Sequence, residues 1–264
     1  MDLLAVLGPG GGPATYRVTG YFEEIQRRKV AWFEQLEVKS GSAAVPMSMA
    51  RAVREIQGAV TDDAIVVTGA GFPQSTVKQR WVTRHPRTHL TSGGFSTMGF
   101  TLPAAIGAQL ADRHRQVLAV CGDGDFLQSM QELAAAVMLD VPVCAVILDN
   151  SGWISIKSGQ QAHFGRTAVT DFLRPDGSVY SPDYAAIGEA FGVHTEQVSH
   201  PTEVGSAVRR ALGSGGPSLV VVRVDRELPA AGPDKPGWWA VPVPAQPAAQ
   251  HADYLAGRAE EQLL

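Results

Sequence analysis

The chain has 264 residues, enough for one α/β domain of ordinary size with terminal extensions. Its 22 basic and 26 acidic residues give a net charge of −4, so no basic excess argues for a nucleic-acid or anionic-membrane partner. The longest apolar runs are too short to cross a bilayer, and the first residues lack the basic start of a secretory signal. The two cysteines, Cys121 and Cys144, argue against a disulfide scaffold and favour a reducing, cytoplasmic setting.

The first 44 residues are interpreted as a flexible arm followed by a linker helix. The run Gly8–Pro13 is rich in glycine but lacks the Lys-Ser/Thr end of a phosphate loop, so we interpret it as part of the arm. Apolar residues at helical spacing predict a helix over Gly20–Leu36. Ser40–Ala44 is interpreted as a linker, and a second helix is expected to open at Pro46.

Short β-branched runs then alternate with helical patterns. Strands are expected at Ala64–Thr68, Thr88–Thr91, Gln116–Cys121, Val143–Leu148, Val193–Gln197 and Ser218–Val224. Helices are expected at Gln74–Val82, Gly99–Ala111, Gln128–Met138, Pro182–Phe191 and Thr202–Leu212. This alternation predicts an α/β fold, namely an open, mostly parallel six-stranded sheet with helices on both faces. The sheet domain is assigned to residues 45–226, and residues 227–264 are a Pro/Ala-rich C-terminal tail.

Four turns at the expected carboxyl ends of strands are rich in Gly, Asp or Asn. They are Gly69–Gly71, Ser92–Gly94, Gly122–Gly124 and Asp149–Gly152. Ligands of an open parallel sheet bind at this edge, and such turns let a phosphate approach the backbone closely.

The clearest chemical signal is Asp123, in Gly122-Asp123-Gly124, together with Asn150 after the next strand. One Gly-Asp-Gly is often only a turn, and one Asn after a strand is often only a helix cap. Two oxygen donors at neighbouring strand ends instead predict a site for Mg²⁺ and a diphosphate. Asp123 would supply a carboxylate, Asn150 its side-chain carbonyl and Gly152 its backbone carbonyl.

The segment from Gly122 to Asn150 resembles the thiamine-diphosphate-binding motif of the acetolactate synthase and 2-oxoacid decarboxylase superfamily. Ser92–Phe100, followed by Leu102–Ala108, is similar to the acetolactate synthase block that cradles the aminopyrimidine ring. The similarity covers about residues 45–225 and falls on the pyrophosphate-binding (PP) domain only. It implies the thiamine-diphosphate-binding fold, with thiamine diphosphate and Mg²⁺ as cofactors.

The resemblance also implies individual roles. The cofactor-binding set is Ala70, Gly71, Gln74, Ser96, Thr97, Met98, Gly122, Gly124, Asp125, Trp153 and Ile154, and the metal set is Asp123, Asn150 and Gly152. Met98 would wedge under the cofactor and hold it bent, the alternative being a core gap-filler. Trp153 would either shape the pocket or seal the end of the sheet. Lys157 could reach a substrate carboxylate, the alternative being a solvated side chain.

Several functions remain open at this stage. Phe72-Pro73 replaces the Gln-His pair usual in acetolactate synthases, and the segment Gly152–Lys157 differs from their substrate-facing segment. The leading interpretation is one subunit of a lyase or carboligase acting on a 2-oxoacid or ketone. The alternatives are a simple 2-oxoacid decarboxylase, a C–C hydrolase of the trihydroxycyclohexane-dione hydrolase type, and a non-catalytic cofactor-binding subunit. Residues Gly237–Val243 of this chain resemble the tail of those hydrolases. A nicotinamide dehydrogenase is disfavoured because Gly69–Gln74 lacks the third glycine of its motif.

A partner chain is also expected. In this superfamily a glutamate of a separate pyrimidine-binding domain hydrogen-bonds the pyrimidine ring, and fewer than fifty residues precede the matched region here. We therefore expect a separate pyrimidine-domain subunit to supply the catalytic glutamate in a heterodimer or heterotetramer. The Gly20–Leu36 helix and Trp238-Trp239 are candidate contacts. No FAD is expected, because acetolactate synthases hold it mainly through a middle domain.

Overall fold

The computed structural model describes residues 20–226, 245 and 248–261. Its centre is a six-stranded sheet in the order β2-β1-β3-β4-β6-β5, and every pair of neighbouring strands is parallel. The strands are β1 (Ile65–Thr68), β2 (His89–Thr91), β3 (Val117–Gly122), β4 (Cys144–Asp149), β5 (His194–Val198) and β6 (Ser218–Arg223). The predicted α/β sheet is therefore confirmed, and it is parallel throughout.

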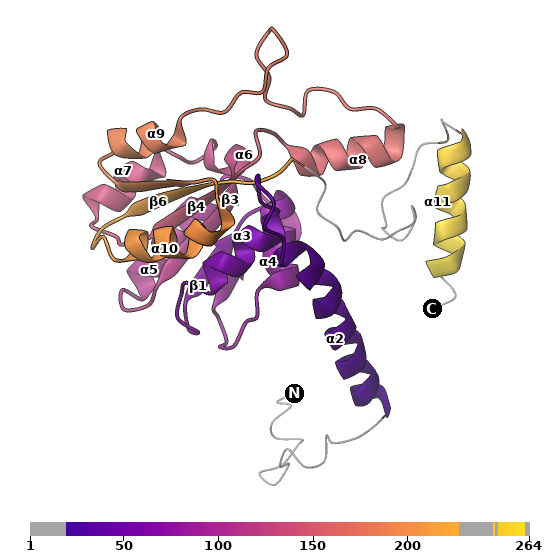
Figure 1. The fold of residues 1–264 in the computed structure, drawn as a ribbon, viewed down its shortest axis with the longest axis horizontal. Coiled ribbons are helices and arrows are strands. Elements are labelled where there is room, and N and C mark those ends of the chain that lie inside the picture. The colour runs from indigo at the N-terminus through magenta and orange to yellow at the C-terminus, as the bar shows by residue number, and fades with distance from the viewer. Residues whose placement is uncertain (1–19, 227–244, 246–247, 262–264) are drawn as a thin grey trace.

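Helices cover both faces of this sheet (Figure 1). The helices are α2 (Gly20–Ser40), α3 (Met49–Gln57), α4 (Gly71–Arg80), α5 (Thr101–Ala111), α6 (Asp123–Phe126), α7 (Glu132–Met138), α8 (Ile154–Phe164), α9 (Tyr184–Ala190), α10 (Pro201–Leu212) and α11 (Ala248–Glu261), with a 3₁₀ turn at Gly93–Phe95. Side chains of α3, α4 and α10 fill the core on one face, and those of α5, α6, α7 and α9 fill the core on the other.

The central strand β4 illustrates why this sequence forms a covered parallel sheet. All six of its residues are buried. Val146 and Leu148 pack into one core, whereas Ala145 and Ile147 pack into the other. A continuous apolar run buried on both faces is what a parallel sheet between two helical layers requires.

Two expected helices begin at other residues, and one further helix was not expected. The helix expected at Pro46 begins at Met49, because the Ser48 hydroxyl caps it by accepting from the Arg51 N–H. Helix α4 begins at Gly71, three residues before the expected Gln74. Helix α8 was not predicted, because its polar and small residues give no apolar period.

Two expected features lie outside the described residues, namely the Gly8–Pro13 arm and Trp238-Trp239. Helix α2 leads away from the sheet, and Ser40 is its only buried residue (Figure 1). Within the described ranges, no helix is long and apolar enough to span a membrane.

The strand order places a switch point beside β1. The chain moves from β1 to β2 on one side and returns as β3 on the other side. In open α/β sheets the crevice outside the carboxyl ends of such strands is where ligands bind. The turns after β1 and β3 meet at this point.

Candidate functional site

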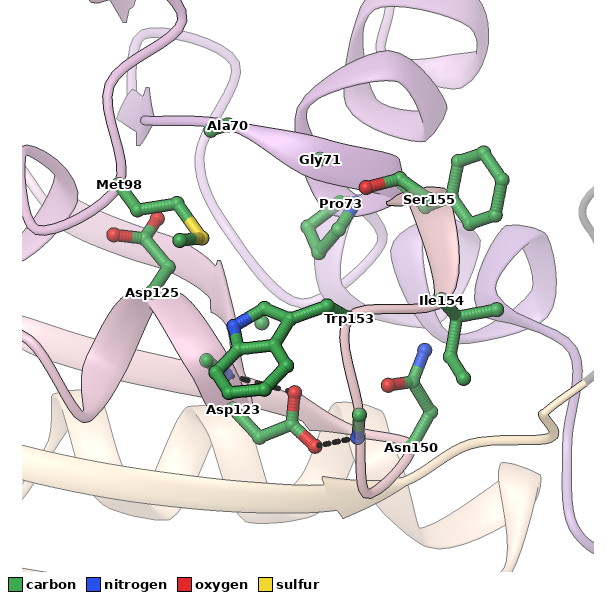
Figure 2. A pocket seen from close by; sticks show the side chains of 14 residues that line it. Ala70, Gly71, Pro73, Met98, Asp123, Asp125, Asn150, Trp153, Ile154 and Ser155 are labelled. Carbon is green, nitrogen blue, oxygen red and sulfur yellow. Dashed lines mark hydrogen bonds between the residues drawn. The ribbon is translucent and has the colours of Figure 1, made fainter. Parts of the chain in front are cut away.

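A small pocket of about 40 Å³ lies at the carboxyl ends of β1, β3 and β4 (Figure 2). Its lining residues are Ala70, Gly71, Phe72, Pro73, Met98, Gly122, Asp123, Gly124, Asp125, Asn150, Gly152, Trp153, Ile154 and Ser155. The turns after β1, β3 and β4, which the sequence separates widely, therefore meet in one place. Most of the predicted site residues are among those that line it.

Asp123 is the most deeply placed acid of the pocket, with 2% of its surface exposed. Its Oδ1 accepts from the Gly124 N–H at 2.8 Å, and its Oδ2 accepts from the Gly152 N–H at 3.1 Å (Figure 2). Burial raises the pKa of this carboxyl from 3.8 to about 7, and the nearby charge of Asp149 acts in the same direction. A cation would relieve both effects.

Asn150 lies beside Asp123 with 6% of its surface exposed. Its side chain comes from the turn after β4 and lines the same pocket as Asp123. The described residues contain no cluster of three or more His, Cys, Asp or Glu that could hold a metal. A cation here would therefore rely on Asp123 with the Asn150 and Gly152 oxygens. These hard oxygen donors fit Mg²⁺, which usually completes its shell with phosphate oxygens and water.

The carboxylate of Asp125 ties the turns together. Its Oδ1 accepts from the Gly99 N–H and its Oδ2 accepts from the Thr101 hydroxyl, both at 2.5 Å. A Cβ on Gly69 would lie 2.7 Å from Asp125 Oδ2, so only glycine fits there. Burial raises the pKa of Asp125, and these hydrogen bonds oppose that rise. Asp125 lines the pocket, but its carboxylate oxygens are engaged by the protein.

Gln74 is a second tie between turns and does not line the pocket. Its Nε2 donates to the Gly69 carbonyl at 2.5 Å and to Thr91 Oγ1 at 2.7 Å, and its Oε1 accepts from the Ser96 hydroxyl at 3.0 Å. The Thr97 N–H donates to Ser92 Oγ at 3.0 Å. These hydrogen bonds hold the turn after β2, which carries Ser96 and Thr97, against the turn after β1.

Met98 and Trp153 form the rim of the pocket, each with 36% of its surface exposed. The Trp153 indole reaches across the pocket from the Asn150 side toward Asp125 (Figure 2). The indole packs so closely on the turn after β3 that a Cβ on Gly124 would lie 2.6 Å from its Nε1. The indole also stands edge-on to the Phe172 ring, with 4.7 Å between centroids.

The structure places Lys157 away from the pocket lining, with its Nζ 2.8 Å from Asp171 Oδ1. Three lining residues were not among the predicted site residues, namely Phe72, Pro73 and Ser155. Ser155 faces Gly71, since a Cβ there would lie 3.5 Å from its Oγ. It is brought there by α8, whose sequence carries no helical signal.

Comparison with known proteins gives consistent results. Residues 69–222 match the C-terminal TPP binding domain of thiamine pyrophosphate enzymes. The mitochondrial acetolactate synthase catalytic subunit of Saccharomyces cerevisiae is 31% identical over 211 residues, which are 79% of this chain and 30% of that protein. The 3D-(3,5/4)-trihydroxycyclohexane-1,2-dione hydrolase of Shouchella clausii is 26% identical over 217 residues, 82% of this chain and 34% of the hydrolase.

The fold has a similar solved counterpart in the Rhodococcus jostii RHA1 thiamine diphosphate-dependent 4-hydroxybenzoylformate decarboxylase. The TM-score is 0.62 at 26% identity, covering 70% of this chain and 34% of the decarboxylase. This chain thus spans about a third of the length of these relatives. The matched residues include the turns after β1, β3 and β4 that form the pocket. On this evidence the chain belongs to the thiamine pyrophosphate enzyme family, through its C-terminal TPP-binding domain.

Proposed function

We propose that this chain is the cofactor-binding subunit of an enzyme that uses thiamine diphosphate and Mg²⁺ to cleave or form a C–C bond of a 2-oxoacid or ketone. The observation that carries the proposal is the meeting of Asp123 and Asn150 in one pocket at the switch point of the sheet. Both side chains are almost fully buried. A buried acid beside an amide oxygen suits a bound cation.

On this proposal Mg²⁺ is held by the Asp123 carboxylate, the Asn150 side-chain oxygen and the Gly152 carbonyl. The ion would offset the repulsion between Asp123 and a diphosphate. The diphosphate would lie against the turn after β1, where Ala70 and Gly71 line the pocket at the start of helix α4. Gly122 and Gly124 would allow equally close approach on the opposite side.

The pyrimidine ring would lie against Met98 and the backbone of Ser96 and Thr97. Met98 is partly exposed on the rim of the pocket, where its side chain could support a bent cofactor. Asp125 and Gln74 would keep the turns in place through the hydrogen bonds described above. When bound, the cofactor supplies a carbon nucleophile that attacks a ketone or 2-oxoacid carbonyl. The residues of this chain bind, orient and shield it.

A second polypeptide would complete the site. No glutamate is among the described residues that line the pocket. Met98 and Trp153 on the rim are partly exposed, and Phe95, three residues before Met98, is 93% exposed. A docked subunit would cover these apolar side chains. Helix α2 adds further exposed apolar residues, namely Tyr21, Phe22, Ile25, Val30, Trp32 and Val38. We infer that a pyrimidine-domain subunit packs here and supplies the catalytic glutamate.

The reaction type separates the candidate functions. Acetolactate synthase and trihydroxycyclohexane-dione hydrolase are both relatives at comparable coverage, so carboligation and C–C hydrolysis are both candidates beside simple decarboxylation. The structural relative is a decarboxylase. A non-catalytic subunit is disfavoured, because such a chain has no need to keep Asp123 and Asn150 together.

The test is turnover of a panel of 2-oxoacids and ketones by the purified chain, alone and with a separately expressed pyrimidine-domain protein, both with thiamine diphosphate and Mg²⁺. We expect activity only in the mixture. The matched control is a partner whose glutamate is changed to Gln, which should bind this chain but restore no turnover. Full turnover by the chain alone would refute the two-subunit proposal. Absence of turnover with the authentic partner would contradict a catalytic role.

A further inference from the structure

The turn that carries Asn150 and Gly152 has an unusual backbone. Ser151, the residue between them, is fully buried and has φ +58, in the left-handed region. Residues other than glycine rarely adopt this conformation and do so only where their surroundings impose it. The direction in which Asn150 and Gly152 present their oxygens therefore depends on the groups that hold Ser151.

Both polar ends of Ser151 are held. Its carbonyl accepts from Arg226 Nη1 and from the Phe172 N–H, each at 3.0 Å. Its N–H donates to Asp149 Oδ1 at 3.1 Å. Of these partners, Arg226 is the only side chain on the carbonyl, and it comes from the segment after β6, far from the turn in sequence.

Arg226 is itself oriented by Asp171. Its Nη2 forms an ion pair with Asp171 Oδ1, and that oxygen also accepts from Lys157 Nζ at 2.8 Å. Burial alone would raise the pKa of Asp171, but the hydrogen bond from Lys157 and the charges of Lys157 and Arg226 lower it overall. The carboxylate thus stays ionised and fixes the guanidinium, whose planar fork bridges a carboxylate and a carbonyl at once.

We propose that Arg226 is a positioning residue for the metal site. By fixing the Ser151 carbonyl, it keeps the Asn150 side chain and the Gly152 carbonyl turned toward Asp123. This role rests on the proposed function, since it concerns the ion assigned there. Lys157 acts one step further away, by holding Asp171 against Arg226. The Arg226→Lys variant has a single donor nitrogen at this position, which cannot span both partners in the same geometry.

A purely structural ion pair makes a different prediction. It would lower thermal stability when removed and leave the affinity for metal unchanged. A positioning role predicts that removal weakens metal binding and changes thermal stability little. Mutation of groups that orient metal ligands typically changes metal affinity by about 10- to 100-fold. Metal affinity measured against metal-free stability therefore separates the two roles.

The experiment titrates Mg²⁺ by calorimetry into the full chain mixed with excess thiamine diphosphate, subtracts the heat of the same titration without protein, and measures thermal unfolding in EDTA. We expect Arg226→Gln to weaken Mg²⁺ binding about 10- to 100-fold, Arg226→Lys to weaken it less, and Asp171→Asn to weaken it as well. Melting in EDTA should change little. If Arg226→Gln fails to fold, Arg226→Lys provides the same comparison.

The matched control is Arg210→Gln, which removes an exposed arginine paired with Glu196 at 2.7 Å and unconnected to the turn. It should leave Mg²⁺ affinity unchanged. Unchanged Mg²⁺ affinity in Arg226→Gln, or a loss equal to that of Arg210→Gln, would overturn the positioning role. Absence of Mg²⁺ binding by the unaltered chain would instead refute the proposed function, and the positioning role with it.

Discussion

The Gly152 N–H donates to Asp123 Oδ2 at 3.1 Å, so the turns that follow β3 and β4 are in direct contact. The sheet creates this contact, because the parallel register places Gly122 opposite Leu148. Both strands end at or just after this pair, so the turns that follow them lie at the same edge of the sheet. A carboxylate and an amide separated by residues 124–149 in the sequence thereby become neighbours.

The carboxyl of Asp123 should make the metal-free protein less stable as the pH rises. Its pKa is raised from 3.8 to about 7, first by burial and then by Asp149. The folded state then binds a proton that the unfolded state has lost, so the contribution to stability is full below pH 3.8 and disappears as pH rises through about 7. Asp123→Asn should remove this dependence.

Melting curves in EDTA from pH 5 to about 8 measure the effect. The stability of the variant relative to the unaltered protein should increase as the pH rises toward 7 and level off above it. Added Mg²⁺ should stabilise only the unaltered protein. A constant difference across this range would contradict the buried, uncompensated carboxyl described here.

Gly124→Ala should destabilise the fold by about 1–3 kcal/mol through overpacking. The new Cβ would lie 2.6 Å from Trp153 Nε1 and must push the indole aside. Adding Trp153→Ala should relieve much of that loss, giving a coupling of about 0.5–3 kcal/mol in a double-mutant cycle. Urea denaturation of the four proteins measures it.

Gly107→Ala is the matched control for this prediction. Gly107 lies inside α5, and a Cβ there would meet nothing within 4 Å. Alanine should therefore stabilise by about 0.5–1 kcal/mol. If Gly124→Ala changes the stability in urea as Gly107→Ala does, the Trp153 indole does not pack on the turn after β3.

Asp125→Asn should destabilise the fold by about 1–3 kcal/mol. The carboxylate accepts from the Gly99 N–H and the Thr101 hydroxyl through different oxygens. An amide keeps one acceptor oxygen and turns two donors toward one of these groups. Thr101→Val, which removes only the hydroxyl, should cost less. Equal stability of Asp125→Asn and the unaltered protein in urea would show that the tie between the turns is not needed.

The sequence predicts both the sheet and the proximity of Asp123 and Asn150 for a common physical reason. Buried parallel strands must be apolar runs, and their carboxyl ends meet at one edge, so Asp123 and Asn150 can be placed from local patterns alone. The roles of Gln74 and Asp125 cannot be placed in this way. The resemblance implies cofactor contacts for both residues, but no local pattern indicates that their side chains also bind neighbouring turns.

The remaining features depend on contacts between distant segments. Arg226 reaches Ser151, and Lys157 pairs with Asp171, but nothing near either residue in the sequence indicates its partner. Helix α8 has no apolar period, so the position of Ser155 in the pocket could not be predicted either. Such features follow from the assembled fold rather than from local propensity.

The most direct test of the account is calorimetric titration of thiamine diphosphate into the chain, with Mg²⁺ and with EDTA, for the unaltered protein and Asn150→Ala. We expect the unaltered protein to bind thiamine diphosphate only when Mg²⁺ is present. Asn150→Ala should bind weakly or not at all while keeping its fold by circular dichroism. Equal affinity in Mg²⁺ and in EDTA, or full affinity in Asn150→Ala, would contradict a metal-bridged cofactor site built on Asp123 and Asn150.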